Sequence, residues 1–159
     1  MNLMNSKIEG ILLLILTIFL PNFAQAFPPR RVKFAGCFDN VARPVAVFMS
    51  CANKRGDCEV RKDSVHTLRA FFRPKHNATA VESFAAWNSW LQVPLPNQDH
   101  DACKYLYQCP LVENRLNSFT YKLKVEAFWP ADTYPVIWTL TDAESEEEVL
   151  CFRFRIVIN

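Results

Sequence analysis

The chain has 159 residues, half of them hydrophobic, and its 18 basic and 16 acidic side chains give a formal net charge of +2. This balance, together with the absence of a basic run, argues against a nucleic-acid partner. The three glycines are too few for a glycine-rich phosphate loop, and the three histidines show no metal-binding spacing. We therefore expect no catalytic residues, no metal site and no cofactor, and predict that the chain is not an enzyme.

Residues 1–26 are typical of a removable signal peptide. Lys7 precedes an apolar stretch over residues 8–20, a proline ends that stretch, and small residues at 24 and 26 suit the peptidase. The stretch is short for a membrane span. We expect cleavage after Ala26, leaving one soluble domain, residues 27–159, that has passed through an oxidising lumen. The protein is predicted to be secreted, with a lysosomal destination as the alternative.

The domain shows period-two alternation of apolar and polar residues and almost no helical periodicity. The alternating segments, in chain order, are 32–38, 45–47, 67–72, 81–95, 119–126, 136–141 and 149–158. An acidic stretch, 144–148, precedes the last of them and is interpreted as an exposed hairpin loop. About seven short antiparallel strands separated by turns predict an all-β sandwich.

Six cysteines allow fifteen connectivities, and spacing alone cannot choose among them. Two pairs flank short loops, so local pairing is plausible within each: Cys51 with Cys58, and Cys103 with Cys109. Cys37 and Cys151 would then remain. Each lies on the charged side of its own alternating segment, so the two could meet on an outer face or an edge. If all six cysteines pair, no thiol nucleophile is left.

Several elements follow one another in an order that resembles a known family. They are the strand ending at Cys37, the close pair Cys51 and Cys58, the stretch 93–96 of sequence VPLP, the pair Cys103 and Cys109 followed by PLV, the Tyr-Pro dipeptide 134–135, and Cys151 in the terminal strand. Together they resemble the Niemann-Pick type C2 group of the ML (MD-2-related lipid-recognition) proteins, in an arthropod-type form. The resemblance implies an ML domain over residues 27–159 with disulfides Cys37–Cys151, Cys51–Cys58 and Cys103–Cys109. It also implies an immunoglobulin-like sandwich with an apolar cavity between slightly splayed sheets.

The resemblance also implies where a ligand would lie. It puts Val93 and Tyr134 at the pocket mouth and a further apolar position near Phe128 to Pro130. From the alternation, the face that carries Trp87 also holds small residues that leave room for a ligand. The phenols of Tyr121 and Tyr134 could hydrogen-bond to a lipid hydroxyl or carboxylate. The predicted ligand contacts are Phe72, Trp87, Val93, Phe119, Tyr121, Phe128, Pro130 and Tyr134, although core packing is the simpler role for any single aromatic residue.

The predicted function is that of a monomeric carrier for a sterol, fatty acid or similar hydrophobic molecule, delivered to a membrane or a receptor protein. Against the family pattern, Val93 stands where the resemblance leads us to expect the aromatic residue of a sterol pocket, which leaves room for other lipids. The alternative is an innate-immune recognition module that binds microbial lipid or glycolipid and docks to a receptor. A basic rim at the mouth would favour the module. Because Arg69, Arg73, Lys122 and Lys124 have outward parity, the sequence favours the carrier.

Asn77 begins the sequence Asn-Ala-Thr, the one N-x-S/T sequon after the leader. It lies between two predicted strands, where a glycan would face solvent. We therefore predict N-glycosylation at Asn77.

Overall fold

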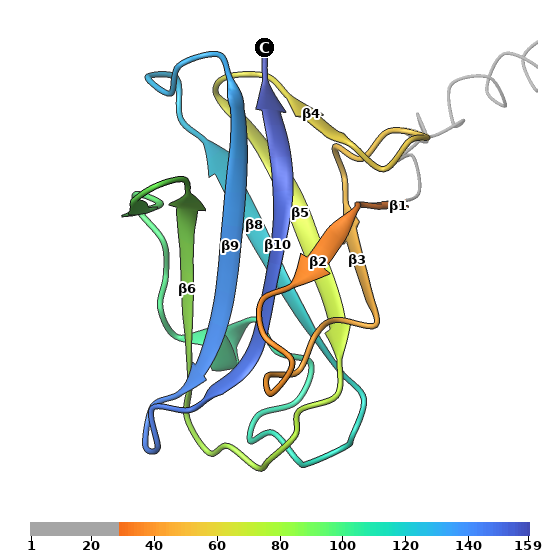
Figure 1. Cartoon of the computed structure of the whole chain (residues 1–159), viewed down its shortest axis with the longest axis vertical. Coiled ribbons are helices and arrows are strands. Elements are labelled where there is room, and N and C mark those ends of the chain that lie inside the picture. The colour runs from red at the N-terminus through yellow and green to blue at the C-terminus, as the bar shows by residue number, and fades with distance from the viewer. Residues whose placement is uncertain (1–28) are drawn as a thin grey trace, which may run out of the picture.

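A computed structural model describes residues 29–159 and contains two facing β-sheets (Figure 1). The expected signal peptide and its cleavage site after Ala26 lie outside the described residues. Apart from strands, the described part contains one short 3-10 helix, η1 (Ala102–Lys104). Within residues 29–159, no helix has the length and apolar character needed to cross a membrane.

One sheet has four strands and the other has six. The four-stranded sheet has the order β1 (Arg30–Arg31), β3 (Ala46–Met49), β5 (Ser64–Phe72) and β8 (Asn117–Val125). The six-stranded sheet has the order β2 (Phe34–Gly36), β10 (Glu148–Ile158), β9 (Thr133–Asp142), β6 (Val81–Asn88) and β7 (Gln92–Pro94), and β4 (Cys58–Val60) also pairs with β10. All pairs of strands are antiparallel except β4 with β10, which is parallel. The predicted all-β sandwich is confirmed.

Alternation identified the long strands because each has one face in the core. On β5 the residues Leu68, Ala70 and Phe72 are fully buried. On β8 every second residue from Asn117 to Val125 is buried, and Lys122 and Lys124 are exposed between them. Each buried Leu or Phe contributes roughly 1.5–3 kcal/mol relative to an exposed position. These side chains, with those of β9 and β10, form the main core.

The segment 81–95, expected as one strand, is instead a hairpin. β6 ends at Asn88, β7 begins at Gln92, and Trp90 in the turn between them is 93% exposed. Trp87 pairs with Val93. Because positions 87 and 93 have the same parity, the alternation of apolar residues continues across the turn. The alternation alone could therefore not reveal the turn. The first expected strand, 32–38, is shorter in the structure, where β2 covers residues 34–36 and β1, just before it, belongs to the other sheet.

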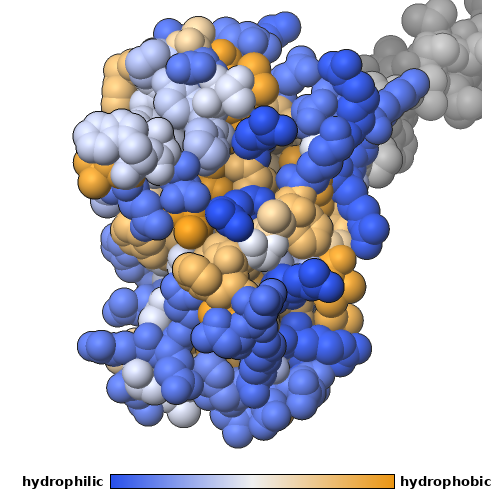
Figure 2. Space-filling view, viewed as in Figure 1, coloured by the Kyte–Doolittle hydropathy of each residue, from blue (hydrophilic) through white to orange (hydrophobic). Residues whose placement is uncertain are grey.

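The outer face of the six-stranded sheet carries a second, smaller apolar cluster. Its buried members are Val41, Ala86, Ile137 and Cys151. The loop that follows β2 covers this cluster, and the backbone N–H of Cys151 donates to the carbonyl of Ala42 at 3.1 Å. Figure 2 shows apolar residues over the middle of this face, whereas the end near the β9–β10 loop is hydrophilic. The acidic stretch expected as an exposed loop, 144–148, is exposed over residues 144–147, while Glu148 is half-buried and begins β10.

The two long edges of the sandwich are closed in different ways. On the β1 side, the chain crosses between the sheets four times, because β1, β3 and β5 belong to one sheet and β2 and β4 to the other. On the β8 side, the segment 99–109 lies between β6 and β8. The N–H of Ser83 donates to the carbonyl of His100 at 2.8 Å, and the N–H of Thr120 donates to the carbonyl of Tyr105 at 2.8 Å. This segment therefore joins the first halves of β6 and β8 and leaves their second halves unjoined.

Three disulfides are present: Cys37–Cys151, Cys51–Cys58 and Cys103–Cys109. The first links the loop after β2 to the centre of β10, with Cα atoms 5.5 Å apart. The second spans the crossing from β3 to β4, and the third lies within the segment 99–109. All three therefore hold loops or crossings against the sheets and do not cross the interior.

Removing Cys37–Cys151 is expected to destabilise the fold more than removing Cys51–Cys58. The two pairs are 114 and 7 residues apart in sequence. In the chain-entropy model, these loops contribute about 4–5 and about 2–2.5 kcal/mol respectively. The double variants Cys37→Ala/Cys151→Ala and Cys51→Ala/Cys58→Ala each delete one buried sulfur and one partly buried sulfur, so they form a matched pair. Guanidinium unfolding should separate them by about 2 kcal/mol, and equal losses would contradict this account.

Candidate functional site

A recess of about 100 Å³ lies at the unjoined part of the β8 edge, and we call it the side recess. One wall is the second half of β8, and the other is the chain after β7. Ala85 of β6 and Trp138 of β9 form its inner surface. The residues that line it are Ala85, Leu95, Pro96, Asn97, Gln98, Tyr121, Lys122, Leu123, Lys124, Glu126 and Trp138. The side recess therefore opens between the sheets at the one part of this edge that the segment 99–109 does not cover.

Gln98 holds one wall of the side recess in place. Its side-chain oxygen accepts from the N–H of Ala85 at 2.7 Å, and its Nε2 donates to the carbonyls of Ala85 and Leu95, each at 3.0 Å. The amide side chain thus replaces the strand partner that β6 lacks beyond β7. Since these bonds are all made to the six-stranded sheet, they do not tie the wall to β8.

The rim of the side recess is charged. Lys124 Nζ lies 3.0 Å from Glu126 Oε2, and Asn97 Nδ2 donates to Glu126 Oε1 across the opening at 3.4 Å. The hydrogen bond from Lys124 lowers the pKa of Glu126, and the same bond raises the pKa of Lys124. Lys122, also exposed, lines the recess without forming an ion pair among the described residues.

These lysines correct one sequence-based inference. Their outward parity was taken to keep positive charge away from the mouth. The parity is right, but β8 is the edge strand of its sheet. Outward side chains of an edge strand can bend around the edge, and Lys122 and Lys124 both line the side recess. The rim is therefore basic in part, and the parity argument does not separate a carrier from a recognition module.

Below the side recess lies a deep aromatic cluster, which we define as Tyr105, Phe119, Tyr121 and Trp138. Tyr121 lies at the centre, with ring centroids 4.8 Å from Tyr105 and 5.0 Å from Trp138. Its hydroxyl accepts from the N–H of Asp99 at 3.0 Å, and Trp138 Nε1 donates to Ser83 Oγ at 3.0 Å. The Tyr121 oxygen and the Trp138 N–H therefore each have a hydrogen-bond partner within the protein.

Asp99 anchors this cluster from outside. Its Oδ2 accepts from Tyr105 Oη at 3.0 Å and from Lys104 Nζ at 3.1 Å. The backbone N–H of Asp101, followed by these two side chains, lowers the pKa of Asp99. Burial and the bond to Asp99 raise the pKa of Tyr105.

Above the side recess lies a second group, the upper aromatic cluster, which we define as Trp87, Trp129 and Tyr134. The Trp87 ring centroid is 5.2 Å from Trp129 and 5.1 Å from Tyr134. The Tyr134 hydroxyl donates to the carbonyl of Pro130 at 3.0 Å. Burial, and then the nearby charge of Asp132, raise the pKa of Tyr134. This cluster closes the end of the sandwich where β6 ends and β9 begins.

The eight predicted contact residues fall in different places. Tyr121 lines the side recess, while Trp87 and Tyr134 belong to the upper aromatic cluster. Phe72 and Phe119 are fully buried in the main core. Val93, 42% exposed, pairs with Trp87 across the β6–β7 hairpin. Phe128, 72% exposed, and Pro130, also exposed, lie in the β8–β9 loop.

Alternation did not point to several residues that line the side recess. Trp138 was assigned to a strand without a role, and Gln98 lies in a loop that the sequence left unassigned. Ala85 was expected only as one of the small residues that leave room beside Trp87. The register brings them together, because Ala85 pairs directly with Trp138. Trp129 is 1% exposed in a loop, a placement that no periodic pattern indicates.

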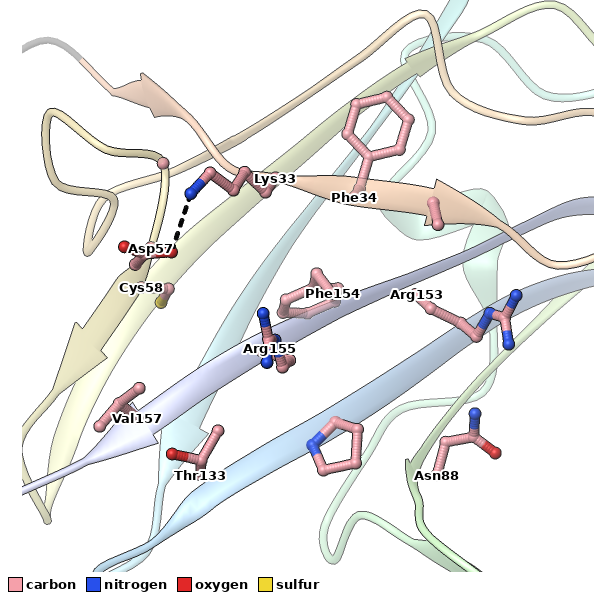
Figure 3. A pocket seen from close by; sticks show the side chains of 13 residues that line it. Lys33, Phe34, Asp57, Cys58, Asn88, Thr133, Arg153, Phe154, Arg155 and Val157 are labelled. Atoms are coloured by element: carbon pink, nitrogen blue, oxygen red, sulfur yellow. Dashed lines mark hydrogen bonds and ion pairs between the residues drawn. The ribbon is translucent and has the colours of Figure 1, made fainter.

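A larger recess, of about 590 Å³, lies on the outer face of the six-stranded sheet (Figure 3). Lys33, Arg153 and Arg155 line it together with apolar residues such as Phe34 and Val157. Figure 3 shows Lys33 directed toward Asp57, and their charged atoms are 3.5 Å apart. This recess is open, lies outside the sandwich and carries three cationic side chains, so its size alone does not make it a site for an apolar ligand. The side recess is smaller but leads to the core.

Comparison with known proteins agrees with this architecture. Residues 31–158 match the family model of the ML domain. The protein belongs to the ML-domain family. NPC intracellular cholesterol transporter 2 of Danio rerio is 26% identical to it over 128 residues, which cover 80% of this chain and 85% of the zebrafish protein. The crystal structure of a Niemann-Pick type C2 protein from the Japanese carpenter ant has a TM-score of 0.71 at 22% identity, covering 80% of this chain and 99% of that one. The family expected from the sequence is confirmed.

Asn77, the predicted glycosylation site, is exposed in the β5–β6 connection. Its Oδ1 accepts from the N–H of Glu113 at 2.8 Å. This bond leaves the amide nitrogen, to which a glycan would be attached, outside the contact.

Glycosylation can be tested without breaking the Asn77 contact. Thr79→Ala removes the sequon and keeps the Asn77 side chain, whereas Thr79→Ser keeps both. Expressed through a secretory pathway, the parent and the Ser variant should lose mass on treatment with an N-glycosidase, and the Ala variant should not. An unchanged mass for the parent would mean that this sequon is not used.

Proposed function

We propose that this protein binds one small hydrophobic molecule between its two sheets and carries it to an acceptor membrane or receptor protein. The observation that carries the proposal is the side recess, where the sandwich opens onto its aromatic core between β8 and the chain after β7. Membership of the ML-domain family supports it. The name of the zebrafish relative, a cholesterol transporter, supports a lipid of sterol size or smaller.

The size of the side recess implies that a ligand must widen it. Pockets for small molecules usually enclose about 300–1,000 Å³, and the side recess has about 100 Å³. The bond from the Asp99 N–H to the Tyr121 hydroxyl, at 3.0 Å, ties the chain after Gln98 to β8 at the base of the recess. Above that bond the two walls are suited to separate, because Gln98 fixes one wall to β6 and the polar contact across the rim is Asn97 to Glu126 at 3.4 Å. A ligand that buried about 300 Å² of apolar surface would gain roughly 7–8 kcal/mol before the costs of association and of opening.

The residues of the side recess suit binding and not catalysis. They include no serine, cysteine or histidine, so the Ser-His and Cys-His pairs that hydrolases use are not available there. Three disulfides and the expected leader support synthesis through an oxidising compartment. We infer a secreted or lysosomal monomer with one ligand site, in a mature domain that begins at residue 27.

The ligand can be identified directly. The purified protein should release a hydrophobic molecule on organic extraction, detected by mass spectrometry, and the emptied protein should bind a fluorescent sterol or a fluorescent fatty acid. Competition between unlabelled cholesterol and oleic acid then ranks the two classes. Binding of neither probe, with no extracted lipid, would refute the carrier. Selective binding of lipopolysaccharide in their place would favour the recognition module.

The location of the site can be tested with two opposite changes in the side recess. Ala85→Phe adds a phenyl ring inside the recess and should reduce probe affinity at least tenfold, while Leu95→Ala enlarges the recess and should preserve binding. Ser89→Phe places the same ring on the exposed turn and serves as the control. Overpacking costs typically 1–3 kcal/mol, so thermal melts must verify folding. Undiminished binding by a folded Ala85→Phe variant would move the site elsewhere.

A further inference from the structure

The four tryptophans of the chain have side-chain nitrogens in three different polar environments. Trp138 Nε1 donates to Ser83 Oγ, and Trp90 is exposed to solvent. Trp87 Nε1 and Trp129 Nε1 are shielded from solvent, yet neither has a hydrogen-bond partner among residues 29–159. A third atom, His76 Nε2, shares this property but lies at the opposite end, near Glu147.

An unsatisfied buried N–H is unusual in a folded protein. Buried indole nitrogens normally find an acceptor, and leaving a donor without one costs about 1–3 kcal/mol. Here two such donors belong to side chains in direct contact, with ring centroids 5.2 Å apart. Two unsatisfied donors in one cluster indicate a place where an acceptor from outside the chain is missing.

The two indoles lie directly beyond the side recess. Two successive inward positions on β6 are Ala85, which lines the recess, and Trp87. Ala85 pairs with Trp138 of β9, and Trp87 pairs with Val136. Trp129 follows Glu126, another residue of the recess, whose carbonyl accepts from the Trp129 backbone N–H at 3.2 Å. A molecule that enters the side recess and extends along β6 therefore reaches both rings.

The two phenols that the sequence favoured as ligand partners are each engaged in one hydrogen bond. Tyr134 Oη already donates to the carbonyl of Pro130. Tyr121 Oη accepts from the N–H of Asp99, which leaves its own O–H to donate. The two indole N–H groups differ from both phenols, because they are buried and have no hydrogen-bond partner among the described residues.

We propose that Trp87 and Trp129 form the polar subsite of the lipid site, in which their indole N–H groups donate hydrogen bonds to an oxygen atom of the ligand. An indole N–H is a donor only, so the subsite selects a hydroxyl, carbonyl or carboxylate oxygen and offers nothing to a hydrocarbon. The inference rests on the proposed function and adds a ligand class to it: oxygenated lipids are bound and pure hydrocarbons of the same shape are discriminated against.

Indole N–H resonances test the subsite directly. In 15N-labelled protein, the four indole signals are assigned with the single variants Trp87→Phe, Trp90→Phe, Trp129→Phe and Trp138→Phe. Cholesterol and oleic acid are then each compared with a hydrocarbon analogue, 5-cholestene and cis-9-octadecene. We expect an oxygenated probe to shift the proton signal of Trp87 or Trp129 downfield, and its analogue to leave it in place. Trp138, already bonded to Ser83, and Trp90, in solvent, are internal controls.

Affinities give an independent readout. Trp87→Phe and Trp129→Phe retain an aromatic ring and remove the N–H. Each should lower the preference for the oxygenated probe over its hydrocarbon analogue by about two- to tenfold, as expected for one hydrogen bond. Because the preference is a ratio, a general loss of packing cancels. Trp90→Phe should leave the ratio unchanged.

The outcomes separate the two proposals. If the oxygenated probes bind tightly but neither indole signal shifts and the ratio is unchanged in the variants, the subsite is refuted and the carrier remains. If neither probe binds the parent protein, the carrier proposal fails and the subsite fails with it. A downfield shift of at least one of the two indoles, together with a reduced ratio in the matching variant, supports both.

Discussion

The hydrogen bonds that the segment 99–109 makes to both sheets determine where this sandwich can open. Strand edges must find partners or cover, and this segment supplies them to the first halves of β6 and β8. The disulfide Cys103–Cys109 restrains the segment, and Asp99 ties its start to Lys104 and Tyr105. On the opposite edge, the successive chain crossings between β1 and β5, with Cys51–Cys58, join the two sheets. The remaining gap, between Gln98 and the second half of β8, is the side recess, so the position of the site follows from how the edges are closed.

Much of the fold was predictable because alternation has a direct physical cause. Leu68, Ala70 and Phe72 had to share a face, as did Phe119 and Leu123, and all of them are buried. The hairpin within 81–95 was not predictable from period two, since the pairing of Trp87 with Val93 preserves parity through the turn. Nor was the division of residues 30–36 between two sheets, because a two-residue crossing leaves no sign in the alternation. The order of cysteines and prolines compensated for both failures and identified the family.

The candidate site was less predictable, because it depends on contacts between distant segments. Tyr121 and Trp87 were found from their parity, but Trp129 lies in a loop and is buried only because the β8–β9 connection folds over Trp87. Parity also misled for Lys122 and Lys124, whose edge position could be known only from the strand order. The hydrogen bonds of the buried tryptophans then distinguished side chains that sequence alternation could not. Trp138 has Ser83 as a partner and contributes to stability, whereas Trp87 and Trp129 keep unsatisfied donors at a cost that the rest of the core must offset.

The burial of β10 has a mechanical consequence. Four successive residues, Val149 to Phe152, are buried, because the main core covers one face of the strand and the loop after β2, held by Cys37–Cys151, covers the other. β8 has no such cover on its outward side, where Lys122 and Lys124 face water. The two sheets are therefore unequal in stiffness: the six-stranded sheet acts as a fixed support, and β8 is the element free to swing outward. Amide exchange should be slow along β10 and faster along the second half of β8. The two sheets would then separate along the β8 edge alone, while the opposite edge stays closed.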